Sequence, residues 1–354
     1  MPEAFFAKHK IKPQKIAVAV SGGADSLYAV LKANEELSSK GFEIIALTVD
    51  HGLRKTSGQE ARFVADLMRQ KGIEHHILCW QGQKPTTGVE DKARIARYAL
   101  LEEWCLNNEV KYLITAHHLY DQVETFFMRL QRGSGLDGLC GMKEITPFKS
   151  IYILRPFLKT NPNVFKTFLK KQNIKWVEDE SNQDERLLRV KMRHFLPLFE
   201  KQTGISALQI AQTMDRLQCS RAYFETTVQK LIQNHFQVFN DKVYCCDSDV
   251  FCGFETEIQY RLLSFLIKKI SRSVYPPEAE KLCALMKKIQ CENFKSATLG
   301  HCRVVRHGNF VWILPEERDS VVFKKTMWRD YIKSNPHLKK MKFPAAVKRF
   351  LFLH

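Results

Sequence analysis

The stretch SGGADS, residues 21–26, follows directly on the apolar run IAVAV, residues 16–20. An apolar run that ends in a glycine pair and then opens an amphipathic segment is typical of a strand, a tight turn and a helix. Glycines let the backbone approach an anion closely, and the N–H groups of the first helical turn point toward it. The stretch therefore predicts a phosphate-binding loop, with the Ser21 and Ser26 hydroxyls as further donors. An ordinary Ser/Gly turn capped by an aspartate is the alternative.

Asp25 distinguishes this loop from the Walker loop, which carries a lysine in the corresponding region. A carboxylate beside phosphates is favourable when a Mg²⁺ ion bridges the two. Asp25 is therefore the candidate Mg²⁺ ligand. The predicted phosphate site comprises Ser21, Gly22, Gly23, Ala24, Asp25 and Ser26.

Strand-like and helix-like segments alternate through the first part of the chain. Because strands joined by crossover helices pair in parallel, this alternation predicts an α/β fold, a Rossmann-like parallel sheet with helices on both faces. Asp50 and His51 end the second predicted strand and would face the crevice where such sheets bind ligands. A structural turn is the alternative for these two residues. The predicted strands cover residues 15–20, 43–52, 73–80 and 110–118.

The alternation ends near Gly133, and a different pattern begins after residue 205. Long helical segments are followed there by short strands around another helix pair, which predicts a smaller mixed α+β domain. We expect a catalytic domain at 1–205, a substrate-recognition domain at 206–315 and a short basic C-terminal region at 316–354.

The 354 residues carry a net charge of +17, a surplus that favours a polyanionic partner. The apolar runs are too short for a membrane helix and the N-terminus lacks an apolar signal core, so we expect a cytoplasmic protein without a membrane partner. The ten cysteines show no zinc spacing and are expected to be reduced thiols. Residues 321–354 hold nine basic residues against one acid: Lys324, Lys325, Arg329, Lys333, Lys339, Lys340, Lys342, Lys348 and Arg349, with Asp330.

Several motifs carry a family resemblance. SGGADS resembles the PP-loop of the N-type ATP pyrophosphatases, which implies that the loop holds the pyrophosphate part of ATP. Five further motifs, in the expected order, are similar to those of the tRNA(Ile)-lysidine synthetase family. They are VDHGLR (49–54), ARIARYALL (93–101), TAHHLYDQVET (115–125), RGSGLDGLCGM (132–142) and EDESNQDERLLRVKMRHFLP (178–197). The later TLGHCRVVRHGNFVWIL resembles the end of the substrate-binding domain of that family.

This resemblance implies an enzyme that uses ATP to join free L-lysine to C2 of the wobble cytidine in the CAU anticodon of tRNA(Ile). The cytidine would first be adenylylated, and the lysine nitrogen would then displace AMP. The modified base pairs with A instead of G, and the tRNA accepts isoleucine instead of methionine. The implied substrates and cofactors are ATP, Mg²⁺, lysine and the tRNA, and the oligomeric state is left open, with a homodimer as one alternative.

Asp121 and Glu124 are spaced so that they share one face of a helix, where both can point at one cation. By the resemblance they bind lysine; a solvated acidic face is the alternative. An ammonium group with a pKa near ~10.4 must lose a proton before it attacks. His117 is the candidate to take that proton or to hold the adenylate, unless the backbone alone satisfies it.

Arg97 matches the catalytic arginine of the family, and its guanidinium would stabilise charge on the α-phosphate. Arg94, one turn earlier, has Glu90 at helical spacing, so an internal ion pair is the alternative for it. The glycine-rich stretch RGSGLDGLCGM is expected to close over the active site or the anticodon, with a plain connector as the alternative. A second basic set is the candidate for the phosphates of the anticodon stem-loop, with a solvated basic face as the alternative. That set is Arg132, Arg189, Lys191, Arg193 and His194.

Two positions depart from the family pattern. Tyr120 stands where many relatives carry a second acid, and Val190 stands where an asparagine is usual. Two other functions share parts of this pattern: a tRNA thiolase of the same fold, and an RNA-binding protein with a decayed ATP site. Thiolases often use paired cysteines, which the sequence lacks, and the intact Asp25, Asp121 and Glu124 argue against a decayed site.

Overall fold

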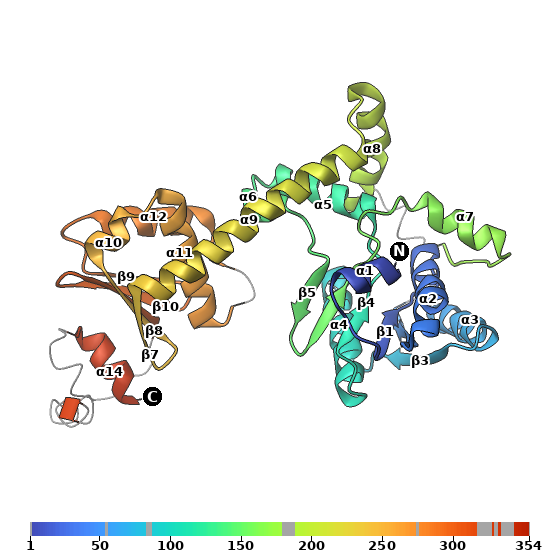
Figure 1. Ribbon diagram of the computed structural model, residues 1–354, viewed down its shortest axis with the longest axis horizontal. Coiled ribbons are helices and arrows are strands. Elements are labelled where there is room, and N and C mark those ends of the chain that lie inside the picture. Colours follow the sequence, from blue (N-terminus) through green and yellow to red (C-terminus); the bar gives the residue numbers. More distant parts are fainter. Residues whose placement is uncertain are drawn as a thin grey trace. The chain divides into compact units, whose positions relative to one another are not determined.

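The computed structural model describes residues 2–53, 56–82, 87–178, 188–273, 276–316, 328, 332–333 and 343–353 (Figure 1). Contacts divide the chain into two compact units, Met1–Cys219 and Ser220–His354. Each unit has its own sheet and its own buried core, so the two are described separately.

The first unit is built on a six-stranded sheet with the order β3-β2-β1-β4-β6-β5. Every neighbouring pair is parallel except β5 and β6, which form an antiparallel hairpin at the edge. The predicted parallel sheet is therefore confirmed. Its strands are β1 (Lys15–Ala19), β2 (Glu43–Asp50), β3 (Glu74–Cys79), β4 (Tyr112–Ile114), β5 (Ile145–Phe148) and β6 (Ile151–Leu154).

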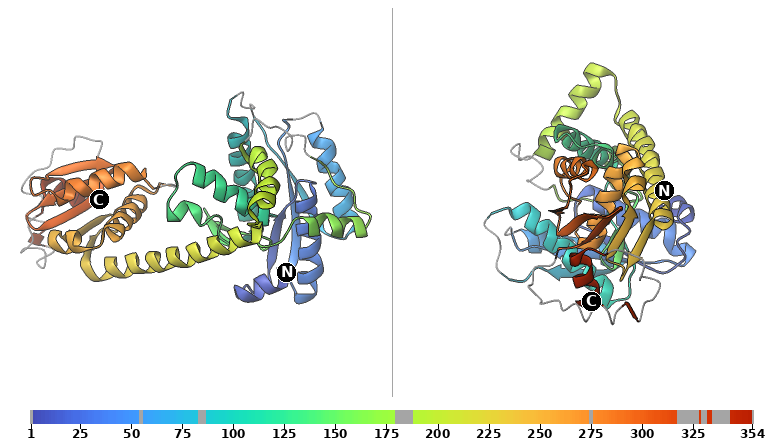
Figure 2. Two further views of the ribbon diagram at one scale, coloured as in Figure 1. Left: turned by 90° about the horizontal axis from the view of Figure 1, so that it is seen from above. Right: turned by 90° about the vertical axis from the view of Figure 1, so that its left-hand side faces the viewer.

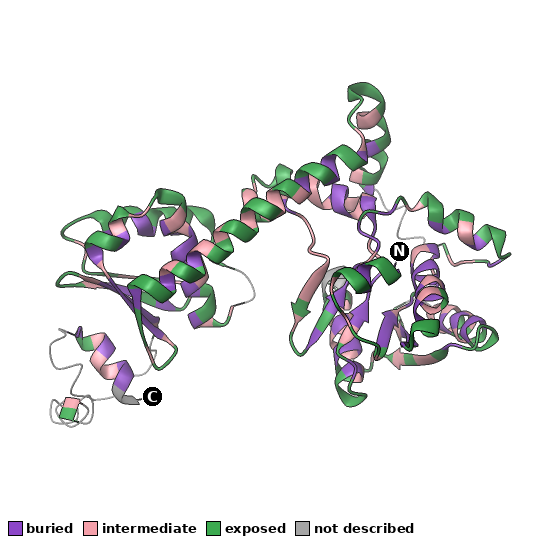
Figure 3. Ribbon diagram, viewed as in Figure 1, coloured by how far each residue is buried: buried purple, intermediate pink, exposed green. Residues whose placement is uncertain are grey.

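Helices cover both faces of this sheet, because successive side chains of each strand point to opposite sides. Val18 packs into a cluster with α2 and α7, whereas Ala17 packs into a cluster with α4. Figure 3 shows the strands buried between helices whose outer surfaces are exposed. One face carries α1 (Pro2–Lys8), α2 (Ala24–Leu37), α3 (Ser57–Gln70) and α7 (Asn163–Lys171), and the other carries α4 (Val89–Asn107).

A helical layer extends this unit beyond the sheet. It consists of α5 (Leu119–Gln131), the short α6 (Leu136–Leu139), α8 (Leu188–Thr203) and the beginning of α9 (Ala207–His235). Leu119 and Val123 of α5, Leu196 of α8 and Met214 of α9 share one buried cluster. This packing holds α8 against α5, and the arrangement positions the site described below.

The second unit is an antiparallel five-stranded sheet with the order β7-β8-β11-β10-β9 (Figure 2). Helices α11 and α12 pack on one face with Val311 and Ile313, and α14 packs on the other with Trp312 and Leu314. The predicted mixed α+β domain is confirmed. Its elements are β7 (Phe236–Phe239), β8 (Val243–Asp247), α10 (Ser248–Gly253), α11 (Thr256–Ser271), α12 (Ala279–Gln290), β9 (Ser296–Leu299), β10 (Cys302–His307), β11 (Phe310–Pro315) and α14 (Ala345–Leu353).

The expected boundaries differ from the observed division in two places. The expected boundary after residue 205 comes just before α9, whereas contacts divide the chain inside that helix, between Cys219 and Ser220. A continuous helix carries no glycine or proline signal at such a point, so the sequence offers none. Phe343 and Val347, from the expected basic C-terminal region, lie in the core of the second unit. Six of the nine basic residues of the segment 321–354 lie outside the described residues: Lys324, Lys325, Arg329, Lys339, Lys340 and Lys342.

Two further observations concern the cysteines and the membrane. All ten cysteines are described and none forms a disulfide. Cys245 and Cys246 are neighbours in β8 and lie in the clusters on opposite faces of the sheet. None of the helices in the described ranges combines the length and the apolar composition that crossing a membrane requires.

Candidate active site at the carboxyl edge of the parallel sheet

The candidate site lies where the strand order of the sheet reverses. β1 is flanked by β2 on one side and by β4 on the other. The strands β2 and β3 are therefore added on one side of β1, and the strands from β4 onward on the other side. Open parallel sheets bind ligands at this point, beyond the carboxyl ends of the two strands. The segment after β1 is the predicted phosphate loop, and the segment after β4 contains His117 and His118.

The phosphate loop depends on its glycines. Gly22 has a φ of +85°, and a Cβ there would lie 3.2 Å from methyl groups of Val64 and Val177. The Val177 N–H donates to the Gly22 carbonyl at 2.9 Å. The Ser26 hydroxyl is occupied inside the loop, because it donates to the Gly23 carbonyl at 2.9 Å and accepts from the Ser21 N–H at 3.1 Å. Ser26 therefore shapes the loop instead of pointing at a ligand.

Helix α2 starts from this loop without a side-chain cap: Gly23 is its extended N-cap residue, and no side chain bonds to the first-turn amides. Orphan N–H groups at a helix N-terminus favour an anion. Asp25 lies in this first turn with its side chain 45% exposed. One accessible carboxylate beside a phosphate cradle fits Mg²⁺, which proteins usually hold by one or two carboxylates together with substrate phosphates.

His118 joins the phosphate loop to α5, a role that the sequence did not suggest. The ring Nδ1 of His118 accepts from the backbone N–H of Asp121 at 3.3 Å. The backbone N–H of His118 donates to Asp121 Oδ2 at 3.0 Å, so the two residues cap α5 reciprocally. Its Nε2 lies 3.5 Å from Asp25 Oδ2. Burial alone would lower the pKa of His118, but the hydrogen bond to Asp25 and the charge of Asp121 outweigh it and raise that pKa. The only sequence signal for this role was the second histidine of the HH pair.

The two predicted lysine-binding acids lie together and are already paired with arginines. Glu124 is fully buried; its Oε2 accepts from Arg189 Nε at 2.7 Å and its Oε1 from Arg193 Nε at 3.0 Å. Arg189 Nη2 also donates to Asp121 Oδ1 at 2.9 Å. Both arginines come from α8 and were expected to meet tRNA phosphates. The structure therefore joins the predicted lysine set and part of the predicted tRNA set in one network.

The charges of this network stabilise one another. Burial alone would raise the pKa of Asp121, but the neighbouring His118 and Arg189 outweigh it and lower that pKa. Burial alone would likewise lower the pKa of Arg189, whereas the carboxylates of Asp121 and Glu124 raise it. Both groups are therefore charged at neutral pH, as a buried pair with good geometry requires.

His117 lies beside this network in the opposite protonation state. Burial and the nearby positive charges of Arg155, Arg189 and Arg94 lower its pKa to about 3, against the charge of Asp121, which raises it. Its Nδ1 is 2.8 Å from the Thr115 hydroxyl. A neutral imidazole with so low a pKa is a weak base, so this geometry favours the predicted role of holding the adenylate over that of taking a proton.

The predicted catalytic arginine lies near the acid network. The guanidinium carbons of Arg94 and Arg97 lie 5.1 and 5.4 Å from the ring centroid of Tyr98. Burial lowers the pKa of Arg97, and the positive charges of Arg94 and Arg189 add to that shift. An accumulation of guanidinium groups favours an anionic ligand such as a phosphate. The Glu90 side chain, the alternative partner of Arg94, lies outside what the structure describes.

The remaining predicted residues have different surroundings. Asp50 accepts from the Gly52 N–H at 2.9 Å, the turn that was its alternative, and His51 packs edge-on against Trp80 at the end of the strand. Arg132 is exposed at the C-cap of α5, and Lys191 and His194 are exposed on α8. Residues 179–187 of the predicted basic motif lie outside the described residues.

The glycine-rich loop after α5 is held at its far end. The Gln122 side chain donates to the Met142 carbonyl at 2.9 Å and accepts from the Met142 N–H at 2.8 Å. Gln218 of α9 donates to the Cys140 carbonyl at 2.8 Å. Gly141 has a φ of +67°, and a Cβ there would collide with Met214 and Gln122. The predicted loop closure over the site is therefore restricted to the part before Cys140.

A phosphate cradle at the switch point of a parallel sheet, with an acid in its first helical turn, defines a PP-loop protein. Residues 3–198 match the family of PP-loop domains. A tRNA(Ile)-lysidine synthase of Wolbachia pipientis wMel is 35% identical over 312 residues, 85% of this chain and 70% of that protein. One of Orientia tsutsugamushi (strain Boryong) is 31% identical over 331 residues, 90% of this chain and 74% of its own. The chain belongs to the tRNA(Ile)-lysidine synthase family.

A solved structure shares the fold. The U34-tRNA thiolase NcsA from Methanococcus maripaludis with its [4Fe-4S] cluster is similar to this chain with a TM-score of 0.50 and 20% identity. The match covers 58% of this chain and 73% of the thiolase. This likeness concerns the fold alone; the family of this chain is that of the lysidine synthases, which decides between the two same-fold enzymes considered from the sequence.

Proposed function

We propose that this chain joins free lysine to C2 of the wobble cytidine of tRNA(Ile) at the site around His118, with ATP as the co-substrate. The observation that carries the proposal is the short path through His118 from the phosphate loop to the acid network. His118 Nε2 lies 3.5 Å from Asp25 Oδ2 and 3.5 Å from Asp121 Oδ2. ATP phosphates and a cationic amine would thus bind close to the same imidazole nitrogen. That arrangement suits a reaction in which the amine attacks an adenylylated base.

In the first step, O2 of the cytidine attacks the α-phosphorus of ATP and pyrophosphate leaves. The amides of the loop and of the first turn of α2 would bind the departing pyrophosphate. Asp25 would hold a Mg²⁺ ion, which supplies charge neutralisation at the phosphates when bound. Arg97 would stabilise the charge on the α-phosphate, as the accumulation of guanidinium groups around it favours.

In the second step, a lysine nitrogen bonds to C2, the C2–O2 bond breaks and AMP leaves, while the ammonium loses a proton. Asp121 and Glu124 would orient the lysine through its positive charge. His117, neutral at physiological pH with a pKa of about 3, would hold the adenylate by a hydrogen bond. Adenylylation is required because an unmodified base oxygen is a poor leaving group.

The test is AMP release from ATP with the full chain. AMP should appear in quantity only when both lysine and a tRNA with a CAU anticodon are present, and labelled lysine should become attached to that tRNA. AMP release without lysine incorporation, or incorporation into tRNA lacking the CAU anticodon, would contradict the proposal. We expect the protein to act in the cytoplasm, where these substrates are.

We also propose that the region from 206 to 315 reads the tRNA outside the anticodon, and that the basic region 316–354 assists. Methionine tRNA shares the CAU anticodon, so discrimination needs contacts elsewhere along the folded RNA. Because the beginning of α9 lies in the core of the first unit, a truncation should follow Cys219 and not residue 205. That truncated protein should keep ATP binding and lose most preference for isoleucine tRNA, together with most of the salt dependence of binding. Unchanged selectivity would overturn this assignment.

A further inference from the structure

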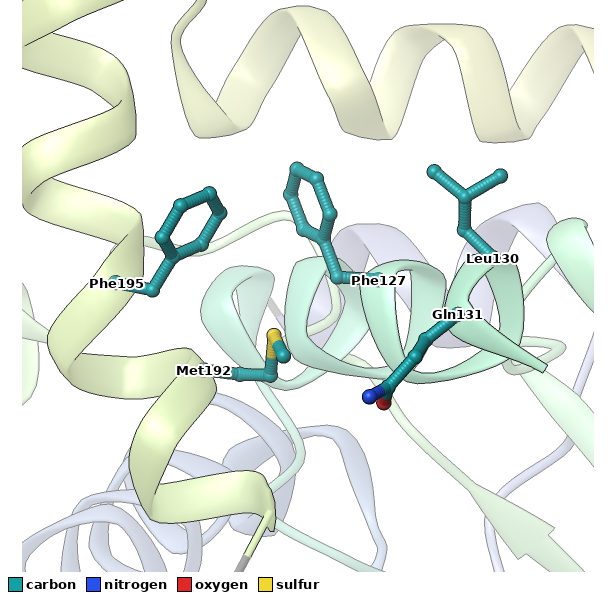
Figure 4. Close-up of a pocket in the computed structure, with 5 residues that line it drawn as sticks. All are labelled: Phe127, Leu130, Gln131, Met192 and Phe195. Carbon is teal, nitrogen blue, oxygen red and sulfur yellow. The ribbon is translucent and has the colours of Figure 1, made fainter.

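An open apolar groove lies between α5 and α8, beyond the acid network. It has a volume of about 310 Å³ and is lined by Phe127, Leu130, Gln131, Met192 and Phe195 (Figure 4). Phe195 is 41% exposed and Leu130 is 49% exposed. The groove therefore presents aromatic and aliphatic surface to solvent, with one amide at its side.

The back of this groove is formed by packed aromatic rings. The Phe127 ring packs edge-on against Phe195 at 5.7 Å and against Phe199 at 5.2 Å between ring centroids. Phe199 and Phe127 in turn pack on the buried cluster that joins α5, α8 and α9. A preformed aromatic wall of this kind can stack a flat ligand at little entropic cost.

The two helices that form the groove carry exposed basic residues at or near it in sequence. Arg129 and Arg132 are exposed at the end of α5, and Lys191 is exposed beside Met192 on α8. Residues 188–199 contain no acid, and the two acids of α5 are the arginine-paired Asp121 and Glu124. An aromatic groove between two helices that carry exposed basic residues suits a nucleobase whose phosphates lie along those helices.

The position of the groove limits which base can reach it. Phe127 and Gln131 lie one and two helical turns beyond Glu124 along α5, which corresponds to about 5 and 10 Å. A nucleotide that places its base at the acid network would thus have a neighbour within reach of the groove. Single-stranded RNA loops are bound in this way, with unstacked bases placed on aromatic side chains.

We infer that this groove binds an unpaired base next to the modified cytidine, stacked against Phe195 and Phe127. The inference rests on the proposed function, because that function brings an anticodon loop to the acid network. The exposed arginines and lysine of the two helices hold the adjoining phosphates, and the Gln131 amide hydrogen bonds to the edge of the base. The groove thereby fixes the register of the loop, so that the cytidine and not its neighbour meets ATP.

The test is a double-mutant cycle with the full chain and an anticodon stem-loop RNA. Phe195→Leu keeps apolar volume and removes the ring, and it should raise the Kd for the stem-loop about 5- to 30-fold. This is the lower part of the range expected for one stacked base, because leucine keeps some apolar contact. Phe195→Trp should bind within about 2-fold of the original chain, because the ring is retained. An RNA with an abasic site beside the cytidine should bind the original chain as weakly as the intact RNA binds Phe195→Leu. For Phe195→Leu, the abasic site should cause no further loss of affinity. Leu198→Ala removes an exposed apolar side chain elsewhere on α8 and serves as the matched control.

Three outcomes would overturn the inference. The first is an unchanged Kd for Phe195→Leu, and the second is that the affinity losses from Phe195→Leu and from the abasic site add independently at every abasic position. The third is a change of oligomeric state without loss of RNA affinity. The last would identify the groove as a contact between copies of the chain. If Phe195→Leu fails to fold, a 2-aminopurine placed beside the cytidine tests stacking with the original chain, where unquenched fluorescence on binding excludes it. Lysidine formation by the original chain is measured in parallel, so failure of the groove and failure of the proposed function are distinguishable.

Discussion

The two halves of the candidate site, which meet at His118, are built differently. The phosphate loop consists of backbone amides and one acid, Asp25, whose side chain is 45% exposed. The acid network consists of side chains, and its central carboxylate, Glu124, is fully buried between two guanidinium groups. The first half is open to its ligand, whereas the second half already contains the charge that its ligand would bring.

This difference has an energetic consequence. A phosphate can enter the loop without breaking a protein ion pair, since the amides of α2 have no side-chain cap. A cation that binds Asp121 and Glu124 must replace Arg189, because that arginine contacts both carboxylates. Buried carboxylates require such a counter-charge in every state of the cycle. We therefore expect ATP binding and lysine binding to respond to different substitutions.

The largest effect is expected on the open half. Asp25→Ala should reduce AMP formation by about 10²–10³-fold or more, on the scale of losing an electrostatic stabiliser of the transition state. Folding and tRNA binding should change little, because the side chain is nearly half exposed. AMP release and tRNA binding measured on the same preparation check this. Normal AMP formation by the variant would remove Asp25 from the ATP site.

The next effect is expected on the closed half. Glu124→Gln removes the charge shared by Arg189 and Arg193, and it should raise the KM for lysine about 10- to 100-fold while the KM for ATP stays nearly constant. Breaking a buried ion pair also destabilises the fold, here by about 3 kcal/mol, at the low end because both arginine side chains are partly exposed.

A matched control separates the two consequences of that substitution. Glu102 is a buried acid of α4 that accepts from Lys149 Nζ at 2.6 Å, outside the acid network. Glu102→Gln should lower stability and leave the KM for lysine unchanged. Equal effects of the two substitutions on lysine dependence would mean that Glu124 acts through the fold alone.

The sequence predicted the open half of the site better than the closed half. The loop was predictable because Gly22 and Gly23 follow a strand directly, and local chain geometry determines where their amides point. The parallel strands were predictable for the same reason, from their alternation with helices. The β5–β6 hairpin was missed, since its short strands, Ile145–Phe148 and Ile151–Leu154, follow a glycine-rich loop and lack a crossover helix.

The closed half depends on contacts between residues far apart in the chain. The spacing of Asp121 and Glu124 predicted a shared helical face, but nothing in it indicated arginines some 65 residues later as their partners. The role of His118 was missed because His117 and His118 are adjacent residues of the same type, so the sequence does not distinguish their roles. Only the cap at the start of α5 separates their roles, since it turns His118 toward Asp25 and His117 toward Thr115.

A smaller effect is expected when Arg189, the counter-charge of the two acids, is replaced. Arg189→Met keeps the apolar stem and frees the Asp121 and Glu124 oxygens, so the KM for lysine should fall about 5-fold, equivalent to about 1 kcal/mol. Arg193→Met, which removes a contact to Glu124 and leaves the Arg189 bond to Asp121, should have the weaker effect. A rise in the KM for lysine in Arg189→Met would show that this arginine helps to hold lysine and does not compete with it.

An effect that appears only when the pH is changed concerns the two adjacent histidines, whose pKa values shift in opposite directions. His117 has a folded pKa of about 3, below its unfolded value of 6.5, so the unfolded chain binds more protons between these values and stability falls as the pH is lowered through that window. His118 has a raised pKa, so its contribution is complete below 6.5 and is lost as the pH rises through its folded value.

These opposite signs give each histidine its own part of the pH profile. His117→Gln should make the decline in stability between about pH 6.5 and 4.5 shallower, by at most about 1.4 kcal/mol per pH unit, the contribution of one group. Part of the decline should persist, because burial also lowers the pKa of His75 in β3 to about 4. Asp121, with a lowered pKa, loses its contribution only below its unfolded value near ~3.9, outside this window. His118→Gln should leave that decline intact and flatten the alkaline side instead. Hydrogen exchange of the β1 and β4 amides reports on this unit alone, and identical profiles for the two variants would show that the imidazoles do not have distinct protonation states.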